Sequence, residues 1–306
     1  MKNYYRSAIL YLAGLISGVL LVSQFAFRED KGDKDADPQP IASMSYEWKA
    51  PKLPASMNFA GEKVPLERWE VKEAFDRELL YNYYIQQNIL YIMKLANRYF
   101  PMIEERLRAN GIPDDFKYLC VAESNLQNLT SKAGAKGFWQ FMPSTGPGYN
   151  LEISDDVDER YNIRKSTDAA CVYLKNAYNK FGSWTAAAAS YNCGMGGYNN
   201  YASFQNTQYY YDLMLPEETN RYIFRILTFK HLMSNAAAFG YKLEENDLYE
   251  NVATKQIAVT SSISNLAAFA KQQGSNYKML KILNPWLRTR KLSVKPGKTY
   301  YIELPK

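Results

Sequence analysis

The chain has 306 residues, more than one domain usually needs, so its length predicts a main domain with a smaller appendage. Hydrophobic residues make up 47% of it and charged residues 22%, both near globular averages, so most of the chain is expected to fold. The net charge of +6 favours anionic partners, among them a membrane surface, nucleic acid or an acidic polymer. His231 is the only histidine, which excludes a histidine-rich metal site. A Ser/His/Asp triad would have to use this one residue. Because His231 lies in a helical stretch, we expect a structural or surface residue.

The first predicted element is an apolar run over residues 8–27, preceded by Lys2 and Arg6 and ended by Arg28. This run is long enough to span a bilayer, and the positive charges before it place the N-terminus in the cytoplasm. The alternative is a cleaved signal peptide, for which residues 22–27 offer a poor cleavage site. We expect an uncleaved signal anchor over residues 1–28.

Residues 29–55 are rich in Asp, Lys, Pro and Ser and cannot bury enough apolar surface to fold, so they are expected to form a tether. From about Pro65 to Tyr241 the periodicity is helical. Within this stretch, Asn110 and Gly111 supply a helix stop, and Pro113 followed by two acids supplies a restart. A helix is therefore predicted to begin at Pro113.

That helix carries the first candidate functional residue, Glu123. Phe116, Leu119, Cys120 and Glu123 stand at i, i+3, i+4 and i+7, which places the carboxyl group on the apolar stripe. Loss of solvation should raise its pKa toward the range of a proton donor at neutral pH. The alternative is a glutamate that caps the helix end or pairs with a base, and this helix alone leaves both open.

The segment from Gly134 to Pro143 places glycines before a dense aromatic run that is interrupted by Gln140. Glycines permit close approach of a ligand to the backbone, aromatic side chains give apolar walls, and we expect Gln140 to orient a hydroxyl or amide group. The three cysteines, Cys120, Cys171 and Cys193, have no CxxC spacing and are predicted to be small core hydrophobes.

After Tyr241 the pattern changes to a strand over residues 256–260, amphipathic stretches over 263–273 and 277–283, and a strand over 300–304. These elements predict a small separate unit. Because it contains none of the candidate groups, we expect deletion of residues 251–306 to leave the chemistry on short substrates intact.

Four ordered motifs between about Arg98 and Tyr241 resemble the lytic transglycosylases with a goose-lysozyme-like soluble transglycosylase domain, and among them the membrane-bound D type with C-terminal LysM modules. The motifs are Glu123-Ser124, the loop Gly134–Pro143, the triplet Ser190-Tyr191-Asn192 in which Ser replaces the usual Ala, and Glu218–Tyr222. The resemblance implies a mainly α fold: a lysozyme-like helical catalytic domain over residues 56–248 and a small α+β LysM-like domain over residues 249–306. In the latter, Thr260–Ser264 stands where LysM modules have a Gly-Asp-Thr turn, which leaves glycan binding by this copy open.

The resemblance also implies a reaction: cleavage of the MurNAc-GlcNAc β-1,4 bond of peptidoglycan with formation of a 1,6-anhydro-MurNAc end, with Glu123 as sole acid/base. The residues that match the substrate-binding groove of the family are Ser124, Ser131, Gln140, Met142, Tyr191, Asn192, Glu218 and Tyr222. Glu218 has a structural alternative, since an acid is favourable at a helix N-terminus in any case.

By the same resemblance the partners are glycan strands and, through the N-terminal segment, the membrane, with no nucleic acid, no metal and no organic cofactor. The expected location is the periplasmic face of the cell envelope. Two alternatives remain: a lysozyme-like hydrolase whose water is positioned by Glu218 or Asp158, and a wall-binding scaffold that grips glycan without cutting it.

Overall fold

The structure, a computed structural model, describes residues 49–306, apart from the side chains of residues 86 and 87. The predicted signal anchor and residues 29–48 of the predicted tether lie outside the described residues. In the described part, no helix combines the length and apolar character needed to cross a membrane. The folded body begins before residue 56, because Pro51 is buried and the Lys52 carbonyl oxygen lies 3.1 Å from Nε2 of His231.

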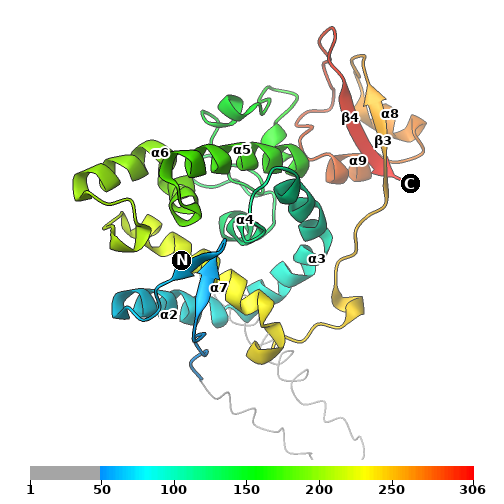
Figure 1. Ribbon diagram of the computed structural model, residues 1–306. Coiled ribbons are helices and arrows are strands. Elements are labelled where there is room, and N and C mark those ends of the chain that lie inside the picture. Colours follow the sequence, from blue (N-terminus) through cyan, green and yellow to red (C-terminus); the bar gives the residue numbers. More distant parts are fainter. Residues whose placement is uncertain (1–48) are drawn as a thin grey trace, which may run out of the picture. The chain divides into compact units, whose positions relative to one another are not determined.

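The described residues form a mainly α fold, as predicted. The main helices are α2 (Trp69–Tyr83), α3 (Gln86–Ala109), α4 (Phe116–Ser124), α5 (Ile163–Phe181), α6 (Trp184–Gln205) and α7 (Glu217–Ser234). Short 3-10 turns lie at Gly146–Tyr149, Glu159–Tyr161, Tyr210–Asp212, Ala236–Phe239 and Glu245–Asp247. Helix α4 lies in the middle, ringed by α3, α5, α6 and α7 (Figure 1). Helix α4 is short and largely buried, so its side chains are surrounded by packed neighbours on several sides.

Helix α4 begins three residues later than predicted, at Phe116. The amide groups of Phe116 and Lys117 donate to carbonyls three residues back, at 3.1 and 3.0 Å, so the segment from Pro113 forms a tighter turn first. The predicted stop is present, since Gly111 has φ +66°. At the other end Asn125 takes the left-handed conformation with φ +52°, which ends the helix one residue after Ser124.

A hairpin of β1 (Met57–Phe59) and β2 (Glu62–Val64) fastens the N-terminal side of the body to the start of α6. The Glu62 carboxylate accepts hydrogen bonds from the amide groups of Trp184 and Thr185, at 2.6 and 2.9 Å. It also accepts from the hydroxyls of Ser183 and Thr185, at 2.9 and 2.6 Å. The N-cap residue of α6 is Ser183, whose hydroxyl accepts from the Ala186 amide, and Glu62 adds acceptors for the two amides before it.

The C-terminal module, residues 249–306, has the predicted order: β3 (Thr254–Val259), α8 (Leu266–Gln272), α9 (Tyr277–Leu283) and β4 (Tyr300–Pro305). The strands β3 and β4 pair antiparallel, with Ile257 opposite Ile302. The module does not pack alone, because its hydrophobic core includes Val157 and Tyr161 from the segment before α5. Both are buried, so the module and the helical body share one apolar contact.

Candidate active site

Glu123 lies on the last turn of α4, at the open end of an apolar stripe. Phe116, Leu119 and Cys120 are fully buried, as their spacing predicts, whereas Glu123 is half-buried and reachable from outside. Loss of solvation raises the pKa of Glu123 from 4.5 to about 7. Near neutral pH the carboxyl group can therefore either donate or accept a proton.

Tyr222 is the direct partner of this carboxyl group. It comes from α7, is buried, and donates its hydroxyl hydrogen to Oε1 of Glu123. Burial keeps the pKa of Tyr222 well above its usual value, so the phenol remains a donor. Burial has the largest effect on the pKa of Glu123. The hydrogen bond from Tyr222 and the positive charge of Arg225 lower this pKa, whereas the negative charge of Glu218 raises it.

Glu218, Tyr222 and Arg225 lie at i, i+4 and i+7 on one face of α7. Glu218 is exposed at the first turn, where its Oε1 lies 3.2 Å from Nη1 of Arg225. Glu218 and Tyr222 belong to the Glu218–Tyr222 motif, whereas Arg225 lies three residues beyond it. Helical spacing would have found it, because these positions recur on one face of a helix.

Residues 134–143, which we call the active-site loop, are fixed to three helices. The Sγ atom of Cys120 in α4 lies 3.6 Å from the Phe138 carbonyl oxygen. The buried indole of Trp139 donates to the Thr167 hydroxyl of α5 at 2.8 Å. The hydroxyl of Tyr191, from α6, donates to the Trp139 carbonyl oxygen at 2.8 Å. The loop, Tyr191 and Glu123 are therefore held as one unit.

Gln140 and Gly137 make contacts within the protein that stabilise the loop itself, and contact of Gln140 with a ligand stays a prediction. Gln140 has φ +47°, and its side-chain amide donates to the carbonyl oxygens of Gly137 at 2.8 Å and Leu129 at 3.3 Å. Gly137 has φ +81°, and a Cβ atom there would lie 1.9 Å from the Arg160 carbonyl oxygen. The backbone that approaches this glycine closely is thus the protein's own.

The remaining predicted groove residues are spread over the site. The Ser124 hydroxyl is buried and donates to the Cys120 carbonyl oxygen at 3.2 Å, so it supports α4. Ser131 is exposed and its hydroxyl accepts from the Ala135 amide at 3.0 Å. Asn192 precedes the break of α6 at Gly194, which has φ +76°, and accepts from the Thr219 hydroxyl at 2.8 Å. Met142 is partly exposed. Contact of these residues with a glycan stays a prediction.

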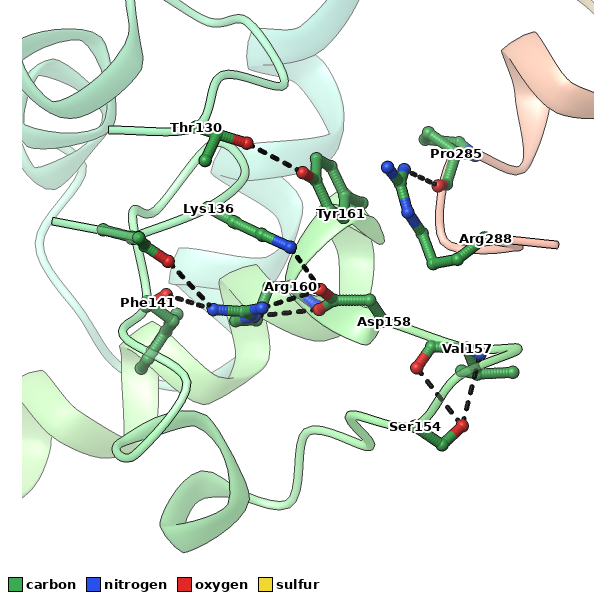
Figure 2. Close-up of polar contacts among 12 residues, drawn as sticks. Thr130, Lys136, Phe141, Ser154, Val157, Asp158, Arg160, Tyr161, Pro285 and Arg288 are labelled. Atoms are coloured by element: carbon green, nitrogen blue, oxygen red, sulfur yellow. Dashed lines mark hydrogen bonds and ion pairs between the residues drawn. The ribbon is translucent and has the colours of Figure 1, made fainter. Parts of the chain in front are cut away.

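Asp158, considered above as a second acid, forms a buried ion pair with Arg160 (Figure 2). The two guanidinium contacts are 2.9 and 2.7 Å long, and the Lys136 ammonium lies 3.6 Å away. Burial alone would raise the pKa of Asp158, but Arg160 and Lys136 outweigh it and lower the pKa. A carboxylate bound in this way is not available to position water. Arg160 itself was missed, because a charged residue in a loop gives no sign that it will be buried.

A cleft of about 640 Å³ opens between the helical body and the C-terminal module. Its walls include Tyr99 and Phe138 from the body and Trp286 and Tyr300 from the module. Glu123 does not line this cleft, although Phe138 of the active-site loop does. Among the described residues, no cluster of His, Cys, Asp or Glu has the arrangement of a metal site.

Two family models match this chain. The model for the transglycosylase SLT domain matches residues 101–213, which hold Glu123, the active-site loop and Tyr191. The chain contains a transglycosylase SLT domain. A second model, the soluble lytic transglycosylase C-terminal LysM-like domain, matches residues 255–306. Tyr222 lies nine residues beyond the end of the matched SLT range at residue 213, yet it is the residue that forms a hydrogen bond with Glu123.

The similarity to curated relatives covers more of the chain than the SLT model does. The membrane-bound lytic murein transglycosylases D of Escherichia coli K12 and of E. coli O6:H1 are each 28% identical over 218 residues, which is 69% of this chain and 47% of theirs. A putative tributyltin chloride resistance protein of Alteromonas sp. strain M-1 is 27% identical over 103 residues, 33% of this chain and 50% of its own. The chain thus spans about half the length of the curated relatives it matches.

Proposed function

We propose that this chain is a peptidoglycan lytic transglycosylase that cleaves the MurNAc-GlcNAc β-1,4 bond and leaves a 1,6-anhydro-MurNAc end. The observation that carries the proposal is the half-buried Glu123, with its pKa raised to about 7 and its carboxylate held by Tyr222, inside an SLT domain. Most glycosidases need two carboxylates, whereas here one stands at the centre of the site.

A single carboxyl group is sufficient if the substrate supplies the nucleophile. Protonated Glu123 donates its proton to the glycosidic oxygen, and the bond between that oxygen and C1 of MurNAc breaks. The 6-hydroxyl oxygen of the same sugar then bonds to C1, and its proton passes to the ionised Glu123. No water is consumed and the acid is regenerated. A pKa of about 7 suits both steps, because each protonation state is accessible at neutral pH.

The second candidate is a hydrolase that uses the same acid and a water molecule. Such a reaction needs a group to position the water, and the ion pair with Arg160 removes Asp158 from consideration. Glu218 is the remaining candidate, because its charge affects the pKa of Glu123. It is exposed and paired with Arg225, an arrangement that also suits a residue at a helix N-terminus. A scaffold that only binds glycan would have no use for a carboxyl group with a raised pKa.

Product analysis tests the proposal. Purified protein lacking residues 1–30 is incubated with peptidoglycan glycan strands, and the new ends are identified by mass spectrometry. We expect ends that weigh one water less than the hydrolytic product and that resist borohydride reduction. Reducible MurNAc ends would show a hydrolase, and intact strands that are retained by the protein would show a scaffold.

We also propose that residues 1–28 anchor the protein in the membrane, with the enzyme on the periplasmic side. The support is the uncharged apolar run over residues 8–27, with Lys2 and Arg6 before it. Full-length protein should stay with the membrane fraction after a high-salt wash, whereas a chain that starts near Lys31 should be soluble. A mature N-terminus just after Phe27 would instead reveal a cleaved signal.

A further inference from the structure

Arg160 is a buried side chain that joins both ends of the active-site loop (Figure 2). Its Nη1 atom donates to the carbonyl oxygens of Gly134 at 3.3 Å and Phe141 at 3.2 Å. Its other nitrogen atoms are fixed by Asp158, and the two side chains are 3% and 5% exposed. One guanidinium group therefore neutralises a buried carboxylate and also closes the loop that contacts α4.

The segment that carries this ion pair is held from its other side by the C-terminal module. The Asp158 amide donates to the Trp286 carbonyl oxygen at 2.9 Å, and the Arg288 amide donates to the Asp156 carbonyl oxygen at 2.8 Å. Between them, Val157 and Leu287 form an antiparallel bridge, and both side chains are buried in the core of the module. Residues 286–288 of the module thus pair through their backbone with residues 156–158.

Side chains reinforce this junction. The Asp156 carboxylate accepts hydrogen bonds from the Thr289 hydroxyl at 2.7 Å, the Ser293 hydroxyl at 2.6 Å and the Ser293 amide at 3.1 Å. The Arg288 guanidinium lies over the ring of Tyr161, 4.1 Å from its centre. The junction therefore combines backbone pairing, a shared apolar core and hydrogen bonds to a carboxylate, and together these hold the module against residues 156–161.

We propose that Arg160 is a positioning residue for the active-site loop, and that the docked C-terminal module holds it in place, so that full turnover at Glu123 requires the module. The proposal rests on the proposed function for its effect on turnover. It reverses the expectation from the sequence that deletion of residues 251–306 leaves the chemistry intact. The module contributes no group to the reaction; it acts through residues 156–158 and then through Arg160.

The sharpest test compares Asp156→Ala with Asp155→Ala in the full chain. Both variants lose one negative charge from adjacent positions, but Asp155 is exposed, whereas Asp156 makes the contacts to Thr289 and Ser293. Hydrogen–deuterium exchange at the loop amides of Lys136, Gly137 and Gln140 reports the state of the loop without any need for activity. We expect exchange there to rise about tenfold or more in Asp156→Ala, because several charge-assisted hydrogen bonds are lost, and to be unchanged in Asp155→Ala.

The second readout is the pH profile of kcat/KM on short glycan chains. A loosened loop admits water to Glu123 and lowers its pKa toward the ordinary value, so the fall in activity on the alkaline side should begin at a lower pH. Simple loss of folded molecules reduces the whole profile without moving this fall. Arg160→Lys keeps the charge but not the forked geometry of the guanidinium group. This variant should also shift the alkaline fall in activity to lower pH, while the module stays docked.

The outcomes are distinguishable. Unchanged loop exchange in Asp156→Ala overturns the proposal, and so does faster exchange with an unmoved pH profile. If Asp156→Ala does not fold, Ser293→Ala removes one of the same contacts and takes its place. If the wild-type protein cuts no glycan, the proposed function fails, while loop exchange still decides whether the module holds the loop.

Discussion

Glu123→Gln should reduce turnover at least about a thousandfold while the fold and glycan binding persist. The amide keeps the shape and the half-buried position of the carboxyl group but has no transferable proton. Tyr222 can still donate to the amide oxygen, so the partner on α7 keeps its acceptor. The measurement is the rate of formation of new glycan ends under single-turnover conditions, alongside binding of an uncut strand.

Stability provides an independent check on the same variant. Since burial raises the pKa of Glu123 from 4.5 to about 7, the folded protein keeps a proton that the unfolded chain releases between these pH values. The associated stability is fully present below about pH 4.5 and is lost as the pH rises through about 7. Above pH 7 the glutamine variant should therefore have the larger free energy of unfolding, by on the order of 2 kcal/mol after allowance for partial exposure.

Glu217→Gln is the matched control, because Glu217 is a glutamate on the first turn of α7 whose side chain is 78% exposed. In this variant, turnover should stay within a small factor of the wild type, and the free energy of unfolding should depend on pH as it does in the wild type. Cleavage by Glu123→Gln at a rate comparable to the wild type would remove Glu123 from the mechanism.

Gly137→Ala should abolish most activity and lower the free energy of unfolding by about 3–5 kcal/mol. Two penalties combine: the residue has φ +81°, and its new Cβ atom would lie 1.9 Å from the Arg160 carbonyl oxygen and 2.8 Å from the carbonyl carbon. Neither the loop nor residue 160 can move without disturbing the contacts of the Arg160 guanidinium group. Urea denaturation and a turnover assay measure the two effects.

The same loop offers a matched control in Gly134→Ala. Gly134 has φ +88°, but a Cβ atom there would have nothing within 4 Å. This variant carries only the backbone penalty, about 1–2 kcal/mol, and should keep activity within a few-fold of the wild type. Equal destabilisation by the two substitutions would mean that close packing against residue 160 is not what Gly137 provides.

Local patterns predicted much of the fold, because each depends on a short stretch of chain. Tyr277–Leu283 forms the predicted second helix of the tail, and the stripe from Phe116 to Cys120 is buried as its spacing requires. The start of α4 was misplaced by three residues, since proline and two acids favour a tight turn as readily as a first helical turn.

The candidate site was predicted in part, since the motifs name its residues but not their contacts. The bond between Tyr222 and Glu123 joins positions 99 residues apart and exists only because α7 packs against α4. The engagement of Gln140 with its own loop and the burial of Arg160 likewise follow from tertiary packing. No local periodicity encodes such pairings, because they depend on how helices distant in the sequence pack together.

The hairpin at Met57–Val64 sets a limit on how far the chain can be trimmed from its N-terminal side. A fragment that begins at Ala50 keeps Glu62 and therefore the acceptor for the first two amide groups of α6. One that begins after Val64 leaves the amide groups of Trp184 and Thr185 without their acceptor, at the start of the helix that carries Tyr191. We therefore expect the smallest stable fragment to start before the hairpin, outside residues 101–213 that the SLT model matches.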